Sequence, residues 1–422
     1  MSDGQRNIVL LTYDSLRADH CGYMGCERDT TPNLDRLADE GVAFENAISP
    51  APRTNPSMAG VFTGEPMAFR EEVSNPEISR RHLKRYGTIA EHLSEMGYTT
   101  GAFNPNAYAS QYYGFDRGFD HYEDFLFSED TYQTIFDRHL DDTGLYRSLR
   151  NIRNFVRGEE VFRTWDTFID DIEQWVNKAD EPYFLWIFSM DTHFPYRTPS
   201  VKRKYSNLLT QFSANWKRNK IIDQLNPELS EKFHDDIVDI YDDAIRFGDT
   251  LLSELSARIG ETNPSIVVHG DHGEALGEQG MYGHFYPSLF EENIHVPLVI
   301  YNSQFGTDRV DEPFPLTRLP SLLRAISRDK EYNLKSSNVA ISSDFDGRRD
   351  RNIISARSGD YKFMLEETKD KQATGFYRVN TSQLSRDVSV EEGPDSLRLV
   401  AKRRNSHESE IVNITKAMQN LN

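Results

Sequence analysis

The chain has 422 residues, of which 37% are hydrophobic, and its 67 acidic and 48 basic side chains give a formal net charge of -19. This length suffices for one large domain, or for one large and one small domain. The acidic balance argues against nucleic acid as a partner, because no surplus of basic side chains exists to displace counterions from a polyanion. The two cysteines, Cys21 and Cys26, are too few for a disulfide framework or a thiolate zinc site.

Two further features bear on location. No run of 18 apolar residues occurs, so no membrane-spanning helix is expected. The amino-terminal stretch MSDGQRNIVLLTYDS lacks the pattern of a secretory signal peptide. The sequence therefore predicts a soluble, cytoplasmic protein.

Short apolar strands alternate with helices along the first three quarters of the chain. The elements predicted in chain order are a strand over Asn7–Asp14, a helix and a strand within Thr31–Ile48, a helix from Pro56, a helix and a strand within Thr88–Phe103, a strand over Pro182–His193, a helix over Asp236–Gly260, and strands over Ser265–Glu274 and His295–Asn302. This alternation predicts an α/β fold with a mostly parallel sheet flanked by helices.

The remaining segments suggest insertions and a different carboxy-terminal part. Residues 122–163 and 201–232 are predicted insertions within a catalytic domain over residues 1–315. The stretches RSGDYKFMLEE and GFYRVN predict two strands of a small antiparallel subdomain over residues 316–390. A charged tail follows over residues 391–422, with an exposed helix predicted over Asp395–Met418.

Oxygen and nitrogen ligands gather where predicted strands end. Asp14 ends the first strand, and Asp271 and His272 follow a late strand in the stretch HGDHGEALGEQG. Because parallel strands present their carboxyl ends at one edge of a sheet, these side chains are expected to meet there. A carboxylate set with one imidazole suits Mn²⁺ or Zn²⁺ better than Mg²⁺ or Ca²⁺. The alternative for Asp271 is the cap of a helix that begins at Gly273.

Three more residues have both a chemical and a structural interpretation. Thr54 precedes the helix predicted from Pro56, so it is either an ordinary helix cap or a nucleophile beside an anion-binding helix start. A threonine hydroxyl needs a base or a metal ion to become a good nucleophile. His193, in MDTHFPY, and His284, in GMYGHF, are either packed side chains or proton donors.

Five fragments in order carry a family resemblance. The stretches DSLRADHCGYMG, TTPNLDRLADEGVAFENA, TNPSMAGVFTG, GDHGEALGEQGMYGH and FEENIHVPLVIY resemble the sulfatase family of the alkaline phosphatase superfamily, over about residues 7–302. The resemblance implies an alkaline phosphatase-like core and hydrolysis of sulfate or phosphate esters. It also implies one divalent cation, held here by Asp14, Thr54, Asp271 and His272.

The resemblance also shows departures at the nucleophile. Thr54 occupies the place of the cysteine or serine that sulfatases convert to formylglycine, and Met58 replaces the arginine that helps to direct this conversion. No formylglycine is therefore expected. An unmodified threonine nucleophile is similar to that of the phosphodiesterase and lipoteichoic acid synthase branches of the superfamily, which transfer phosphoryl groups.

The remaining site residues follow from the same resemblance. Asn104 and Asn106 stand where sulfatases carry a charged substrate-binding segment, and with Arg17 they are predicted to contact the substrate, a small-molecule or glycan ester. Either His193 or His284 is predicted to donate the proton to the leaving group. Three functions remain open: an ester hydrolase, a phosphoglycerol-type transferase acting on a glycan or lipid, and a catalytically silent binding protein.

Overall fold

The computed structural model describes residues 5–67, 75–125, 163–221, 224–284, 288–335, 339–347, 350–379 and 387–419. Most of the insertion predicted over residues 122–163 lies outside these ranges, because residues 126–162 are not among them.

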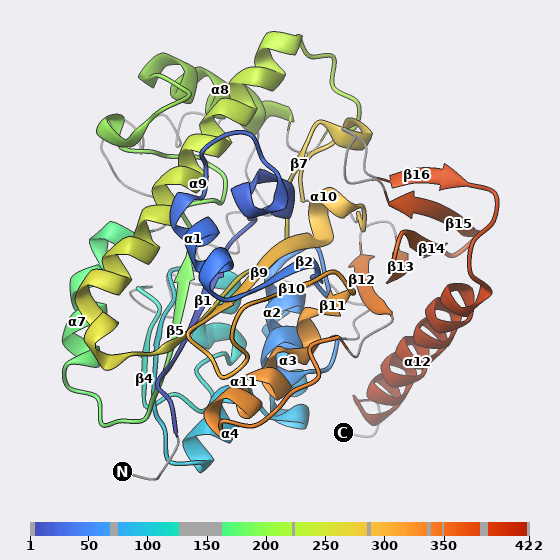
Figure 1. Ribbon diagram of the computed structural model, residues 1–422. Coiled ribbons are helices and arrows are strands. Elements are labelled where there is room, and N and C mark those ends of the chain that lie inside the picture. The colour runs from blue at the N-terminus through green and yellow to red at the C-terminus, as the bar shows by residue number, and fades with distance from the viewer. Residues whose placement is uncertain are drawn as a thin grey trace.

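A nine-stranded mixed sheet forms the centre of the molecule (Figure 1). Its strands follow the order β10-β2-β9-β6-β1-β5-β3-β4, and β11 pairs with β2. Their bounds are β1 Ile8–Tyr13, β2 Val42–Ile48, β3 Thr99–Phe103, β4 His121–Glu123, β5 Tyr183–Ser189, β6 Ser265–Gly270, β9 His295–Tyr301, β10 Asp308–Val310 and β11 Phe314–Pro315. The central strand β1 pairs in parallel with β5 on one side and β6 on the other.

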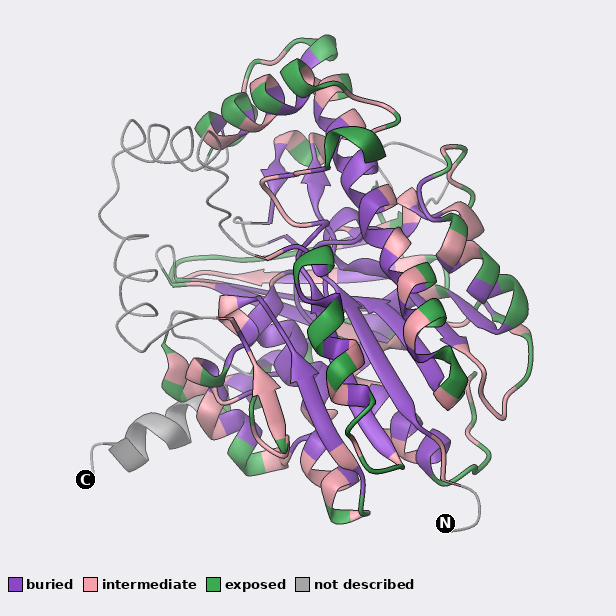
Figure 2. Cartoon of the chain, turned by 90° about the vertical axis from the view of Figure 1, so that its left-hand side faces the viewer, coloured by how far each residue is buried: buried purple, intermediate pink, exposed green. Residues whose placement is uncertain are grey.

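Helices cover both faces of this sheet, which explains why its strands read as continuous apolar runs. Alternate residues of β1 enter two cores: Val9 and Leu11 pack into one, Ile8 and Leu10 into the other. The first core is completed by α1 Pro32–Glu40, α7 Ile169–Val176 and α9 Glu231–Ile259. The second is completed by α2 Thr54–Thr63, α3 Pro76–Tyr86, α4 Ile89–Glu95 and α11 Leu319–Ser327. Figure 2 shows the sheet buried between helices whose outer faces are exposed.

Strand β9 is the exception to the parallel pattern. It runs antiparallel to both β6 and β2. The chain leaves β6 at the sheet's carboxyl edge and stays there through β7 Ala275–Leu276, β8 Tyr282–Gly283 and the short helix α10 Glu291–Ile294. It therefore re-enters the sheet from the same edge and has to run in the opposite direction.

The carboxy-terminal part forms a second, five-stranded antiparallel sheet in the order β12-β13-β14-β15-β16. Its elements are β12 Ala340–Asp346, β13 Arg351–Ser358, β14 Tyr361–Glu367, β15 Gln372–Val379, β16 Asp387–Val390 and the helix α12 Asp395–Gln419. Leu397 and Ala401 of α12 are buried against this sheet, so the helix is not exposed on all sides. Together the two sheets confirm the predicted fold class.

One further helix, α8 Leu208–Ile221, lies in the second predicted insertion and packs against α9. In contrast, α11 follows the domain boundary predicted at residue 315, but its leucines pack into the second core of the main sheet. The division into residues 1–315, 316–390 and 391–422 stays a prediction.

Candidate active site

The site lies at the carboxyl edge of the central sheet, where Asp14 follows β1. Its backbone N–H continues the strand ladder by donating to the carbonyl of Ser189, at 3.0 Å. The next residue, Ser15, has a φ of 59°, a left-handed conformation that is unusual for a residue other than glycine. This sharp turn lets the Ser15 hydroxyl donate to Asp14 Oδ1 at 2.7 Å, while the Ser15 N–H donates to Asp271 Oδ1 at 3.0 Å.

Asp271 and His272 occupy the equivalent position after β6. Asp271 Oδ1 accepts two backbone N–H groups, from Ser15 at 3.0 Å and from His272 at 2.7 Å. Its other oxygen, Oδ2, is buried and has no hydrogen-bond partner among the described residues. The chain continues from here into β7, so Asp271 does not cap a helix, and the alternative interpretation of this residue is wrong.

The tautomer of His272 follows from its surroundings. Nδ1 lies 2.8 Å from the carbonyl oxygen of Gly273. A carbonyl oxygen only accepts hydrogen bonds, so Nδ1 carries the proton and Nε2 presents a lone pair. Nε2 lies 3.7 Å from Asp14 Oδ1 and 3.6 Å from Asp271 Oδ2.

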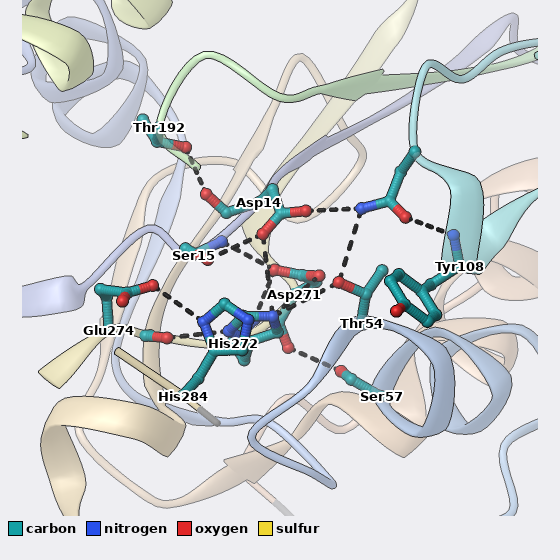
Figure 3. A network of polar contacts seen from close by, with 12 residues as sticks. Asp14, Ser15, Thr54, Ser57, Tyr108, Thr192, Asp271, His272, Glu274 and His284 are labelled. Carbon is teal, nitrogen blue, oxygen red and sulfur yellow. Dashed lines mark hydrogen bonds and ion pairs between the residues drawn. The ribbon is translucent and has the colours of Figure 1, made fainter. Parts of the chain in front are cut away.

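These three residues fit a divalent cation. One ligand atom from each lies within 4.8 Å of the others, and all three side chains are fully buried (Figure 3). Burial, and then the charge of Asp271, raises the pKa of Asp14 to about 7, and burial raises the pKa of Asp271 to about 7. Two buried carboxylates beside an imidazole lone pair are a donor set that a borderline cation would satisfy.

Thr54 reaches this group from the start of α2. Its Oγ1 lies 3.4 Å from His272 Nε2, and the side chain is only 7% exposed. Helix α2 begins at Thr54, two residues earlier than predicted, and Arg53 occupies the cap position without a side-chain cap bond. Ser57, one turn later, donates to the carbonyl oxygen of Asp271 at 2.6 Å and so fixes α2 against the end of β6 (Figure 3).

The two asparagines after β3 have different surroundings. Asn106 Oδ1 accepts from the backbone N–H of Tyr108 at 2.7 Å, which identifies Nδ2 as the atom that faces the site. Nδ2 donates to Asp14 Oδ2 at 2.6 Å and to Thr54 Oγ1 at 3.5 Å. Asn104 instead donates to the carbonyl of Ala109 at 2.6 Å and holds the loop together.

His284 lies beside the proposed metal ligands at the end of β8. Its ring centroid is 4.5 Å from that of His272 and 5.5 Å from that of His193. Its Nδ1 lies 2.8 Å from Glu274 Oε2 (Figure 3). The other carboxylate oxygen of Glu274 is ion-paired with Arg218 of α8.

The charges of this group differ from one residue to the next. Burial alone would raise the pKa of Glu274, but Arg218 and His284 outweigh burial and hold this pKa well below its usual range, so Glu274 stays ionised. Burial, and then His284, lowers the pKa of His193 to about 3, so His193 is neutral at pH 7.

Two arginines near the site have structural partners. Arg17 was predicted to contact the substrate, but its guanidinium donates to Asp19, to Glu278 at 2.7 Å and to the Glu274 carbonyl at 3.0 Å. These contacts direct Arg17 into the protein rather than toward a substrate. Arg53, next to Thr54, donates from Nε to Asp344 Oδ1 of β12 at 3.0 Å and from Nη2 to the carbonyl of Phe345 at 2.8 Å.

The sequence patterns did not identify two residues of the site, Glu274 and Arg218. Glu274 stands only two positions after His272, and the short stretch GDHGE was the available signal. Arg218 is isolated on α8 within a segment without any motif, and only the fold brings it to Glu274.

Comparison with known proteins decides the family. A family-wide sequence profile described as Sulfatase matches residues 6–314. The chain belongs to the sulfatase family. Its relatives include an ulvan-active sulfatase of Formosa agariphila, 26% identical over 70% of this chain and 55% of that protein. They also include the phosphatidylethanolamine transferase Mcr-1 of Escherichia coli, 22% identical over 71% of this chain and 49% of that protein.

Solved structures support the same fold. The phosphonate monoester hydrolase of Agrobacterium radiobacter superposes with a TM-score of 0.62 at 16% identity, over 98% of this chain and 96% of that one. By contrast, the chain spans little more than half the length of the ulvan-active sulfatase and about half that of the Mcr-1 transferase. Among the described helices, none combines the length and apolarity needed to cross a membrane.

Proposed function

We propose that this member of the sulfatase family is a metal-dependent hydrolase of sulfate or phosphate esters, with the unmodified hydroxyl of Thr54 as nucleophile. The observation that carries the proposal is the position of Thr54 Oγ1, 3.4 Å from His272 Nε2 and beside the buried group of Asp14, Asp271 and His272. The family match and the ulvan-active relative support an ester of a small molecule or a glycan as the substrate.

Asp14, Asp271 and His272 would hold the cation, with Thr54 Oγ1 completing the set. When bound, a divalent cation favours the ionised form of a nearby hydroxyl and offsets negative charge on the transferred group. The donor set favours Mn²⁺ or Zn²⁺ over Mg²⁺ or Ca²⁺.

The first step is carried by the threonine. Oγ1 of Thr54 gives its proton to solvent water and forms a bond to phosphorus or sulfur, and the bond from that atom to the alcohol oxygen of the ester breaks. The Nδ2 group of Asn106, held in place by Asp14 and Tyr108, donates a hydrogen bond to a non-bridging oxygen of the transferred group. Such a donor stabilises charge that grows in the transition state.

The leaving oxygen takes its proton from His284. Because Nδ1 of His284 donates to the ionised Glu274, proton exchange with the substrate falls to Nε2. His193 is neutral at pH 7 and supplies a hydrogen bond rather than a proton. Water then returns a proton to His284 Nε2 and attacks the phosphorylated or sulfated Thr54, and the bond from phosphorus or sulfur to Oγ1 breaks. Sulfate or inorganic phosphate leaves from a monoester, and a phosphate monoester leaves from a phosphodiester.

The test compares Thr54→Ala with Thr54→Ser on p-nitrophenyl sulfate and bis-p-nitrophenyl phosphate, with Mn²⁺ or Zn²⁺ present. We expect Thr54→Ala to lose roughly 10³-fold or more in kcat, whereas Thr54→Ser keeps measurable turnover. Intact-mass and peptide spectrometry are expected to find residue 54 as an unmodified threonine. Full turnover by Thr54→Ala would refute the nucleophile. No turnover of either ester by the wild type would favour the silent binding protein.

A second candidate is a transferase that passes the phospho-alcohol group to an acceptor alcohol. The similarity to the Mcr-1 transferase favours it. Chemically, it differs from the hydrolase only in the second step, where an alcohol replaces water. Adding glycerol to the phosphodiester assay separates the two: a transferase forms glycerol p-nitrophenyl phosphate at the expense of the hydrolysis product p-nitrophenyl phosphate.

A further inference from the structure

Helix α8 has a buried face and an exposed face. Its inner face is formed by Gln211, Ala214, Arg218 and Ile221, all buried. On the opposite side, Leu208 and Leu209 are 54% and 80% exposed, and Trp216 is 37% exposed. Residues 208, 209 and 216 fall within about a third of a turn of each other on a helix of 3.6 residues per turn. The exposed side of α8 is therefore an apolar stripe.

Exposed apolar side chains are concentrated here. Of the eight large hydrophobic residues that are exposed in the described part of the chain, six lie between residues 201 and 225. Val201 is the most exposed, at 88%. The other two, Val388 and Leu399, belong to the carboxy-terminal part. Exposed apolar residues scattered singly are ordinary, but such a concentration marks an interaction surface.

The same segment has a charge opposite to that of the whole protein. Residues 201–221 contain six basic side chains and no acidic one, whereas the chain carries a net charge of -19. Lys202, Lys217 and Lys220 are exposed. The ammonium group of Lys220 lies 3.4 Å from the ring centroid of Trp216. Lysines that border exposed leucine and tryptophan side chains are typical of helices that lie in the interface of an anionic membrane.

We propose that this surface of α8, formed by Leu208, Leu209, Trp216, Lys217 and Lys220, binds the headgroup region of an anionic lipid bilayer. The helix would lie on the bilayer rather than cross it, in agreement with the absence of a spanning helix among the described ones. A sulfated glycan would satisfy the lysines and the tryptophan but would leave the leucines in water, so a lipid surface fits the whole stripe better. The lysines complement the anionic headgroups and the leucines enter the acyl boundary.

The surface and the site lie on opposite sides of one helix. Arg218, on the inner face of α8, pairs with Glu274, which contacts His284. In Figure 1, α8 lies at the upper edge of the molecule, beside the start of α9. Bilayer binding would therefore bring the wall of the site close to the lipid surface. The proposal does not require the proposed catalytic reaction.

Co-sedimentation with vesicles tests the proposal on the full chain. We expect binding to vesicles of phosphatidylcholine with about one third phosphatidylglycerol, and little binding to pure phosphatidylcholine. Two double variants, Leu208→Ser with Leu209→Ser and Lys217→Glu with Lys220→Glu, are each expected to lose roughly tenfold or more in apparent affinity. The matched controls are Leu399→Ser, at a position 67% exposed, and Lys369→Glu, at a side chain 78% exposed, and both should bind as the wild type does.

Trp216 provides a second readout that is independent of the variants' stability. Of the four tryptophans, Trp165 and Trp186 are buried and Trp175 is half-buried against the core, so a blue shift of the emission on adding anionic vesicles is expected from Trp216. This shift should disappear in Trp216→Phe. Equal pelleting of the double variants and the wild type would overturn the proposal. Binding to dextran sulfate without binding to vesicles would also overturn it, because the surface would then bind a polyanion. A dimer that forms without lipid and that Leu209→Ser dissociates would overturn it too, because the stripe would then be a contact between two copies of the chain.

Discussion

Asn106 donates a hydrogen bond from Nδ2 to Oδ2 of Asp14 across 2.6 Å, and so joins the loop after β3 to the end of β1. The same amide lies 3.5 Å from Thr54 Oγ1. Its position depends on the backbone N–H of Tyr108, which occupies the amide oxygen. One amide group of Asn106 therefore contacts both the proposed nucleophile and a proposed metal ligand.

Replacing Asn106 should lower the rate more than the affinity. We expect Asn106→Ala to lose about 10²–10³-fold in kcat, with a smaller change in KM, because a donor to the transferred group acts mainly in the transition state. Asn106→Asp keeps the acceptor for Tyr108 N–H but places a carboxylate beside Asp14, so its loss should be at least as large. Steady-state kinetics on the better of the two p-nitrophenyl esters measures both. An unchanged kcat in Asn106→Ala would remove this residue from the mechanism.

Metal analysis should find about one divalent ion for each chain, lost in Asp271→Ala. The buried Oδ2 of Asp271 has no hydrogen-bond partner among the described residues, so it is available to the ion, and removing it leaves the ion with fewer ligands. Asp249→Asn is the matched control. Asp249 is a buried carboxylate that accepts from Asn33 N–H at 2.9 Å, and it does not belong to the proposed metal ligands. Ion retention in Asp271→Ala, measured by plasma mass spectrometry after gel filtration, would contradict the assigned ligands.

Ion retention should also depend on pH. The pKa values of Asp14 and Asp271 are raised to about 7 in the absence of a cation, so protons compete with the ion as the pH falls below 7. We expect the apparent dissociation constant, measured by titration calorimetry, to increase steadily from pH 8 to pH 5.5. Constant affinity over this range would show that neither carboxylate is a ligand.

Removing one member of the pair of Arg218 and Glu274 should lower the free energy of unfolding strongly, whereas replacing both members should change it little. Both side chains are fully buried, so Glu274→Gln leaves an unpaired buried guanidinium, and the free energy of unfolding should fall by about 3–5 kcal/mol. The double variant Arg218→Met with Glu274→Gln should recover most of this loss, as a double-mutant cycle in urea would show. If the double variant folds as well as the wild type but its pH–rate profile is altered, Glu274 acts by positioning His284.

His193 should make the protein less stable in mild acid. Its pKa is lowered in the folded state, so the unfolded chain binds more protons below about pH 6.5, and the free energy of unfolding falls as the pH decreases toward 3. In EDTA, His193→Gln should lose roughly 1–2 kcal/mol less than the wild type between pH 6.5 and pH 5. His407→Gln, at an exposed position, should follow the wild type. The free energies come from urea unfolding curves at each pH. An equal pH-dependent loss in all three proteins would refute the effect.

The main sheet could be predicted because its strands are buried on both faces. A run such as IVLLTY is mostly apolar and is buried at every position, and the Asp14 that follows it marks the carboxyl edge. The reversal of β9 could not be predicted, because an antiparallel buried strand has the same composition as a parallel one. It follows from the path of the chain between residues 271 and 294, which the local pattern does not determine.

The candidate site was predictable where a residue stands at a strand end. Asp14, Asp271, His272 and Asn106 are such residues, and the fold brings all four together. Arg17 and Asn104 also stand near strand ends, but their donors are directed to Glu278 and Ala109. Side-chain direction depends on the partners that the tertiary structure supplies, and Arg218 reaches Glu274 across 56 residues for the same reason.

The contact between Arg53 and Asp344 joins residues 291 positions apart. Arg53 precedes Thr54 directly, while Asp344 belongs to the small sheet, which follows the main sheet in the chain. On the ribosome, the main sheet can form before residue 344 emerges, but the turn that carries Thr54 then still lacks this anchor. A nascent chain would therefore form the main sheet first, and the hydroxyl of Thr54, the proposed nucleophile, would reach its final orientation only after β12 has joined it.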